Sequence, residues 1–137
     1  MKIVFADTGY WIAMINKKDS LHQKARQVTL EMNPIKIITS EMILSELLDS
    51  FSKQGLFLKQ ATVNLINRSY DNPNIDIIQQ NPQLFKQALN LYNQRLDQQW
   101  SHTDCSSFII MQNYQIREAL AYDKHFEQAG FIALLRT

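Results

Sequence analysis

Four carboxylates stand at points along the chain from which a single metal site could be assembled. Asp7 follows the first apolar run, Glu46 lies within a helix-like stretch, Asp104 begins another, and Asp123 follows a late apolar run. Hard cations such as Mg²⁺ and Mn²⁺ prefer oxygen ligands, bind phosphate oxygens and activate water. An acidic set without accompanying His and Cys ligands therefore indicates phosphodiester chemistry.

The elements that would position these acids alternate between strand and helix. Short apolar, partly β-branched runs predict strands over Lys2 to Ala6, Ile35 to Thr39, Ile75 to Ile78, Glu118 to Tyr122 and Phe131 to Leu135. After a brief helical turn over Tyr10 to Ile15, apolar residues at helical spacing predict helices over Leu21 to Glu31, from Ser40 to Gly55, over Leu58 to Tyr70, from Pro82 to Leu96, and from Thr103 to Tyr114.

Local signals set the ends and faces of these helices. Ser20, Ser40 and Thr103 are the predicted N-caps, because a hydroxyl oxygen can accept a hydrogen bond from a free N–H of the first turn. Gly55 is the predicted stop of the helix that begins after Ser40. In the helix that begins at Pro82, Phe85, Leu89 and Tyr92 are expected to share one face.

Strands that alternate with helices predict a parallel, helix-covered sheet with right-handed crossovers. Residues 1–137 are expected to form one domain. Ligands of such sheets bind outside the carboxyl ends of the strands. Asp7 and Asp123 each end a strand, and Asp104 begins a helix at that same edge. Glu46 lies about two turns into its helix but can lean back over the rim, because helical side chains point towards the helix N-terminus.

Each acid also has an ordinary structural interpretation. Asp7 and Asp123 could be turn residues, the former together with Thr8 and Gly9. Asp104 would complement the helix dipole in a first turn. Glu46 is the weakest candidate locally, because most helical glutamates are solvated and Asp49 offers a competing carboxylate. The metal-site interpretation therefore depends on all four acids meeting.

Composition excludes several classes of protein. With 137 residues, 45% hydrophobic and 20% charged, the chain is typical of a folded globular domain. A formal net charge of +1 gives no basic excess, so contact with nucleic acid must rest on a local patch; the candidate backbone contacts are Lys17, Lys18, Lys53 and Arg117. The apolar run before Asp7 is too short for a signal peptide or a membrane span, and a cytoplasmic protein is expected.

Other reactive residues lack a pattern. His22, His102 and His125 show no ligand spacing with one another or with Cys105, so a zinc site is not expected. A nucleophilic Cys–His pair is conceivable, but a small thiol facing the core is the commoner role for Cys105. Trp11 and Trp100 could stack on bases, although core packing is the favoured interpretation.

Four segments together resemble a known family. FADTGYWIA from Phe5, SEMILSELLDSF from Ser40, WSHTDCSSFIIM from Trp100 and ALAYDKHFEQAGF from Ala119 are similar, in order and over essentially the whole chain, to PIN domains, particularly the small VapC-type ribonuclease toxins. The resemblance implies an α/β fold of three layers, α/β/α, with a central, mainly parallel sheet. It also implies Mg²⁺ or Mn²⁺ held by Asp7, Glu46, Asp104 and Asp123, with the hydroxyls of Thr8 and Ser101 in support.

The resulting hypothesis is a metal-dependent endoribonuclease that cleaves RNA. The resemblance further implies a cognate antitoxin whose tail covers the cleft, and a homodimer. A non-catalytic RNA-binding or scaffold form of the fold is the alternative. A phospho-acceptor receiver domain would require a lysine where Asp123 stands, and a flap-type nuclease needs additions for which 137 residues leave no room.

Overall fold

The computed structural model describes all 137 residues and is built on one five-stranded sheet. The strands are β1 (Lys2–Ala6), β2 (Ile35–Ser40), β3 (Ile75–Ile78), β4 (Glu118–Leu120) and β5 (Ile132–Ala133). Their order is β3-β2-β1-β4-β5, and every neighbouring pair is parallel. The predicted parallel sheet is confirmed, and its central strand, β1, is the apolar run predicted as a strand over Lys2 to Ala6.

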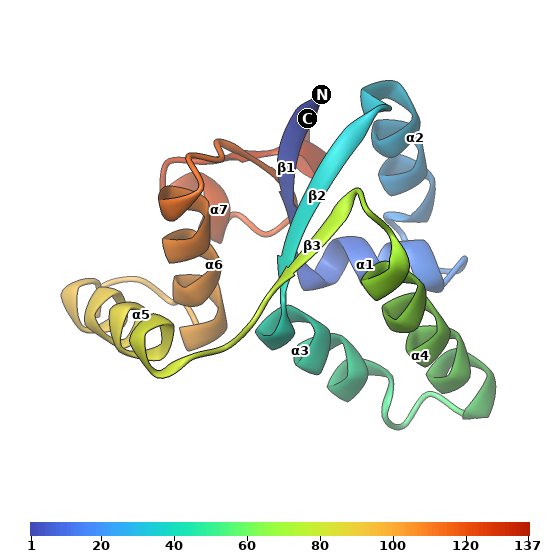
Figure 1. Ribbon diagram of the computed structural model, residues 1–137, viewed down its shortest axis with the longest axis horizontal. Helices are drawn as coiled ribbons and strands as arrows, with labels where there is room; N and C mark the ends of the chain where they lie inside the picture. Colours follow the sequence, from blue (N-terminus) through green and yellow to red (C-terminus); the bar gives the residue numbers. More distant parts are fainter.

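Helices cover both faces of the sheet (Figure 1). They are α1 (Thr8–Ile15), α2 (His22–Met32), α3 (Glu41–Phe51), α4 (Leu56–Asp71), α5 (Pro82–Gln94), α6 (His102–Asn113) and α7 (His125–Gln128), with a 3₁₀ turn, η1, at Leu134–Arg136. One face carries α1, α2 and α4, and the other carries α6 and α7, with α5 packed outside α6. The three-layer α/β/α architecture is confirmed. None of these helices is both long and apolar enough to cross a membrane.

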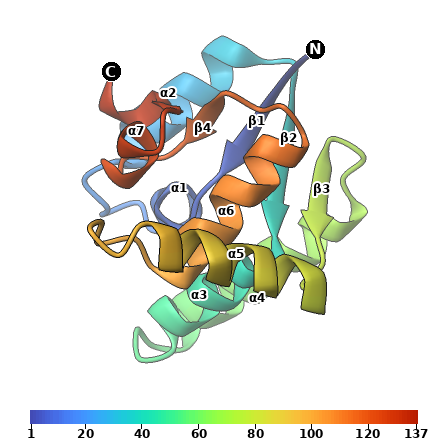
Figure 2. The ribbon, with the colours of Figure 1, turned by 90° about the vertical axis from the view of Figure 1, so that its left-hand side faces the viewer.

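The carboxyl ends of the strands share one edge of the sheet, and α3 crosses below it (Figures 1 and 2). The central strand β1 is held from both sides, because it pairs with β2 and β4. Val4, Phe5 and Ala6 are fully buried. The chain therefore delivers Asp7 to this edge from the buried central strand of the sheet.

Several predicted boundaries are wrong. The turn predicted at Tyr10 is a full helix from Thr8, and Ser20 is not an N-cap, because the Asp19 carboxylate accepts the Leu21 N–H instead at 2.9 Å. Gly55 does not end α3, which stops at Phe51; with φ +91°, it precedes the first residue of α4. The last strand is only two residues long, because Leu134 to Arg136 turn into η1.

The apolar face predicted for α5 points away from the core. Phe85, Leu89 and Tyr92 are 45%, 49% and 43% exposed, whereas Leu84 and Ala88 are buried against the rest of the molecule. The helix carries two apolar stripes, and the narrower one fits against α6. Pro82 does stand in the first turn, as predicted, after the N-cap Asn81.

Candidate active site

Asp7 is placed by the pairing of the two central strands. Its backbone N–H donates to Leu120 O at 3.1 Å, which ties the end of β1 to the end of β4. The residue is the N-cap of α1, but its carboxylate makes no capping hydrogen bond. A turn residue would use its side chain locally. The carboxylate of Asp7 is therefore free for another partner.

The electrostatics of Asp7 are unusual for a carboxylate at a helix start. Burial raises its pKa from 3.8 to about 7, against the backbone N–H of Thr8, which lowers it. The negative charges of Asp104, Glu46 and Asp123 raise the pKa further. The ionised form of Asp7 is thus poorly compensated by protein groups, which is the condition under which a cation binds with most effect.

Glu46 is brought to the same edge by α3. The Ser40 hydroxyl caps this helix by accepting the Ile43 N–H at 3.2 Å, as predicted, and Ile43, Leu44 and Leu47 bury its inner face. The hydroxyl of Thr8 donates a short hydrogen bond to Oε1 of Glu46. The residue that follows Asp7 therefore orients the carboxylate that arrives from α3.

Asp104 is fixed by the cap of its own helix. The N-cap of α6 is Ser101 and not Thr103 as predicted: the Ser101 hydroxyl accepts the Asp104 N–H at 2.9 Å, and Oδ2 of Asp104 accepts the Ser101 N–H at 3.0 Å. The reciprocal bonds of this capping box satisfy two otherwise free donors. Ser101 supports the acid through the backbone, and Oδ1 of Asp104 remains without a protein donor.

Asp123 meets Asp104 through a residue that the sequence analysis did not select. Nδ1 of His125 lies 2.9 Å from Oδ2 of Asp104 and 3.2 Å from Oδ1 of Asp123. The backbone N–H of His125 also donates to Oδ1 of Asp123 at 3.0 Å. A search for metal-ligand spacing could not find this histidine. The usable signal was its place two residues after a strand-end aspartate.

All four acids surround one hollow of about 670 Å³ at the carboxyl edge of the sheet. That volume suits a nucleotide segment as well as an ion. Besides the acids, it is lined by Thr8, Gly9, Ile12, Leu21, Gln99, Ser101, Tyr122, Lys124, His125 and Arg136. The sequence expectation that the four carboxylates share one edge agrees with this arrangement.

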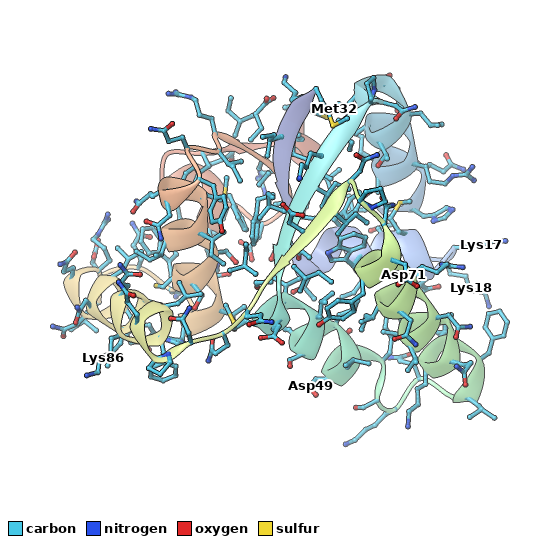
Figure 3. The ribbon with its side chains drawn as sticks, in the orientation of Figure 1. Lys17, Lys18, Met32, Asp49, Asp71 and Lys86 are labelled. Atoms are coloured by element: carbon cyan, nitrogen blue, oxygen red, sulfur yellow. The ribbon has the colours of Figure 1, made fainter.

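Two cations stand beside the acids, and one of them is held in place. The Arg136 guanidinium donates to Tyr122 O at 2.8 Å, pairs with Glu127 at 3.1 Å, and lies 4.9 Å from the centre of the Tyr122 ring. Lys124 is exposed and makes no ion pair. Lys17 and Lys18, by contrast, project from the outer edge of the molecule beyond α1 (Figure 3).

The donor set suits a hard cation, although no three Asp, Glu, His or Cys side chains lie close enough to bind one ion directly. Mg²⁺ commonly takes only one or two carboxylates and completes its octahedron with water and substrate phosphate. The free oxygens of Asp104 and Asp123 and the uncompensated carboxylate of Asp7 offer that chemistry. The residues present therefore fit Mg²⁺ or Mn²⁺.

The remaining reactive residues are structural, as favoured from the sequence. Burial and the charge of Asp104 raise the pKa of the Cys105 thiol to about 11, so it is not a poised nucleophile. Trp11 and Trp100 are buried, with their indole N–H groups facing Thr39 and Gln128. The rings of His22 and His102 contact the backbone carbonyls of Ala13 and Phe85 and make no hydrogen bond to the four acids.

Comparison with known proteins agrees with this site. No family model matches the chain. It is 26% identical over 133 residues to the 23S rRNA-specific endonuclease VapC20 of Mycobacterium tuberculosis, in two strains, covering 95% of this chain and 96% of the relative. The crystal structure of VapC20, described as a sarcin–ricin loop cleaving toxin, superposes with a TM-score of 0.83 at 25% identity over 94% of this chain and 96% of that one. Both comparisons confirm the resemblance noted from the sequence motifs: in sequence and in fold, the chain is similar to a VapC-type toxin.

Proposed function

We propose that the protein is a metal-dependent endoribonuclease. The observation that carries this proposal is the meeting of Asp7, Glu46, Asp104 and Asp123, from four separate elements, around one hollow. The likeness over nearly the whole chain to an rRNA endonuclease supports the same conclusion.

The chain's own residues divide into ligands and orienting groups. Asp7, Asp104 and Asp123 would hold the cation directly or through its bound waters, and Glu46 would act as a further ligand or as the base that orients water. The Thr8 hydroxyl supports the latter role, because it fixes one oxygen of Glu46 and leaves the other free. When bound, Mg²⁺ or Mn²⁺ supplies Lewis-acid stabilisation of charge on the phosphate.

The substrate would be RNA, presented as a loop that can enter the hollow. Arg136 and Lys124 lie at its rim, where they would contact phosphates beside the one that is cleaved. Arg136 is already ordered by Tyr122 and Glu127, so contact with phosphate would cost little side-chain entropy. By analogy with VapC20, ribosomal RNA in the cytoplasm is the first substrate to test.

A toxin of this kind would have an antitoxin partner. Besides the acidic hollow, which would accept a basic side chain, the chain exposes Leu56 and Phe57 at 84% and 83% on the first turn of α4. Exposed apolar residues of this size mark protein-binding sites. Co-expression with the product of a short upstream gene should restore growth that the protein alone arrests. Growth arrest that no neighbouring gene relieves would contradict the proposal that the protein is the toxin of a toxin–antitoxin pair.

The protein would also form a homodimer through α5. The outer stripe of this helix is exposed and apolar, with Phe85, Leu89 and Tyr92 in it and Leu96, 69% exposed, just beyond it. Lys86 is the only charged residue of α5, and it lies on the outer side of the helix (Figure 3). A nearly neutral stripe flanked by Gln and Asn does not repel its own copy, whereas it offers little to nucleic acid.

Light scattering on the purified protein tests the dimer. Leu89→Glu should convert a dimer to a monomer with an unchanged circular dichroism spectrum, while Lys59→Glu, on the exposed side of α4, should leave the mass at twice that of the chain. A wild-type protein that is strictly monomeric at micromolar concentration would contradict the proposal.

Cleavage of a mixed RNA panel that includes ribosomal RNA tests the activity itself. Cutting should require Mg²⁺ or Mn²⁺, stop with EDTA, and vanish in a folded Asp7→Asn variant. Cutting by Asp7→Asn at the wild-type rate would show that a contaminating nuclease is responsible. Metal binding without cutting of any RNA would favour the non-catalytic RNA-binding alternative.

A further inference from the structure

We propose that His125 is a positioning residue that joins Asp104 and Asp123 into one rigid pair, so that each carboxylate presents a single oxygen to the cation. This inference rests on the proposed function. It assigns to one imidazole a task that the four acids cannot perform themselves, because like charges at one edge repel one another.

The hydrogen bonds of the two carboxylates are asymmetric in the same way. Oδ2 of Asp104 accepts both protein donors, the Ser101 N–H at 3.0 Å and Nδ1 of His125 at 2.9 Å. Oδ1 of Asp123 likewise accepts the His125 backbone N–H at 3.0 Å and lies 3.2 Å from Nδ1 of the ring. No protein donor reaches the other oxygen of either side chain. One oxygen of each acid is therefore anchored, and the other is available.

The ring nitrogen that faces the two acids acts as a hydrogen-bond donor. Nδ1 donates its hydrogen to Oδ2 of Asp104, and Oδ1 of Asp123 lies 3.2 Å from the same nitrogen. Nδ1 is for that reason not itself a metal ligand. The arrangement has the form of a ligand that is oriented by a hydrogen-bond partner, a kind of partner whose removal typically weakens metal affinity or activity by about 10- to 100-fold.

The ring is also held by elements that cannot drift apart. Its neighbour Phe126 is fully buried and packs edge-on against Phe108, with ring centroids 5.1 Å apart. Phe108 belongs to α6, the helix whose first turn carries Asp104. The His125 side chain is only 18% exposed. A core contact thus sets the spacing between the two segments that the imidazole bridges.

A simpler role for His125 would be to stabilise the turn before α7. In that role its loss would lower the melting temperature but would not change how the protein binds metal. Amide side chains separate the two roles, because the Asn amide nitrogen lies close to where Nδ1 of histidine stands, whereas the Gln amide nitrogen reaches the position of Nε2. His125→Asn keeps the bridging donor, and His125→Gln displaces it.

Titration calorimetry with Mn²⁺ alone provides a readout independent of RNA. We expect His125→Gln and His125→Ala to weaken Mn²⁺ binding by about 10- to 100-fold, and His125→Asn to recover most of the loss. With RNA, kcat should fall in His125→Gln while KM changes less than about twofold, because the substrate contacts are intact. His22→Gln, on the remote helix α2, should match the wild type in both assays.

Equal losses in the Asn and Gln variants would overturn the inference, since the donor position would then not matter. So would wild-type Mn²⁺ affinity in all three variants. Failure of the proposed function has a different signature: wild-type protein that cuts no RNA, whatever the order of Mn²⁺ affinities. Far-UV circular dichroism identifies a misfolded variant, and the Asn and Gln pair, matched in polarity, keeps the comparison valid when Ala does not fold.

Discussion

The two halves of the acidic edge are stabilised in opposite ways. Asp104 and Asp123 lie on the side of α6 and α7, where backbone and imidazole donors satisfy one oxygen of each. Asp7 lies at the end of the buried strand β1, where desolvation raises its pKa to about 7 and no side-chain donor reaches it. The first pair has a fixed geometry, whereas Asp7 carries an electrostatic cost.

This difference indicates what each half contributes to the proposed site. A pre-oriented pair lowers the entropy cost of binding a cation, whereas a buried, uncompensated carboxylate gains the most from the charge that the cation brings. Asp7 should therefore contribute the largest gain in free energy when metal binds. For the same reason, Asp7 should destabilise the protein most when metal is removed.

Replacing Asp7, the uncompensated acid, should have opposite effects on activity and on stability. Asp7→Asn should lower the rate of RNA cleavage by about 10³-fold, because loss of a cation contact removes several kcal/mol of transition-state stabilisation. At pH 8 and without metal, the same change should stabilise the fold by about 1–3 kcal/mol, since an amide is cheaper to bury than a charge. Urea unfolding with EDTA measures this, and Asp49→Asn on the exposed side of α3 is the matched control. A less stable Asp7→Asn protein would show that the carboxylate is already compensated.

The pH dependence of stability should also show the cost of burying the ionised Asp7 carboxylate. The pKa of Asp7 is about 7 in the folded protein and 3.8 in the reference state, so between these values the folded protein binds the additional proton. Stability without metal should accordingly fall as the pH rises from about 4 to 7, by at most about 4 kcal/mol, and level off above. Urea midpoints in EDTA across this range, compared with Asp7→Asn, isolate the contribution. Identical pH profiles of the two proteins would contradict it.

Sequence alone reached the parts of this site that follow from connectivity. Asp7 directly follows β1, and Asp123 follows β4 after Ala121 and Tyr122, so the rule for ligand sites in parallel sheets brought the two acids together. The sequence analysis assigned the cap of α6 to Thr103 in place of Ser101, since both have hydroxyls. It did not identify the buried face of α5, because a helix with two apolar stripes buries the one that its neighbour fits. The sequence analysis did not select His125 as a site residue, because its partners are carboxylates that come together only in the fold.

Binding of metal should reverse the cost at Asp7. Mn²⁺ at about 100 times its dissociation constant should stabilise the wild-type protein by about 2.7 kcal/mol through mass action. Asp7→Asn should gain less at the same concentration, since it lacks the charge that the cation offsets. Urea unfolding at pH 8 with and without Mn²⁺ measures both gains. The same measurement with Ca²⁺ shows whether the gain depends on the size of the cation. A wild-type midpoint that saturating Mn²⁺ leaves unmoved would argue against the metal site.

The smallest expected effect tests the fixed half of the edge. Ser101→Ala removes the hydroxyl that caps α6 and should cost about 1 kcal/mol of stability. The backbone N–H of residue 101, however, still donates to Asp104, and so does Nδ1 of His125. Mn²⁺ affinity should therefore change by less than about threefold, because a fold-change of that size corresponds to under 1 kcal/mol. Calorimetry at a temperature where the variant is fully folded tests this. An affinity loss as large as that of His125→Gln would mean that the helix cap, and not the imidazole, sets the position of Asp104.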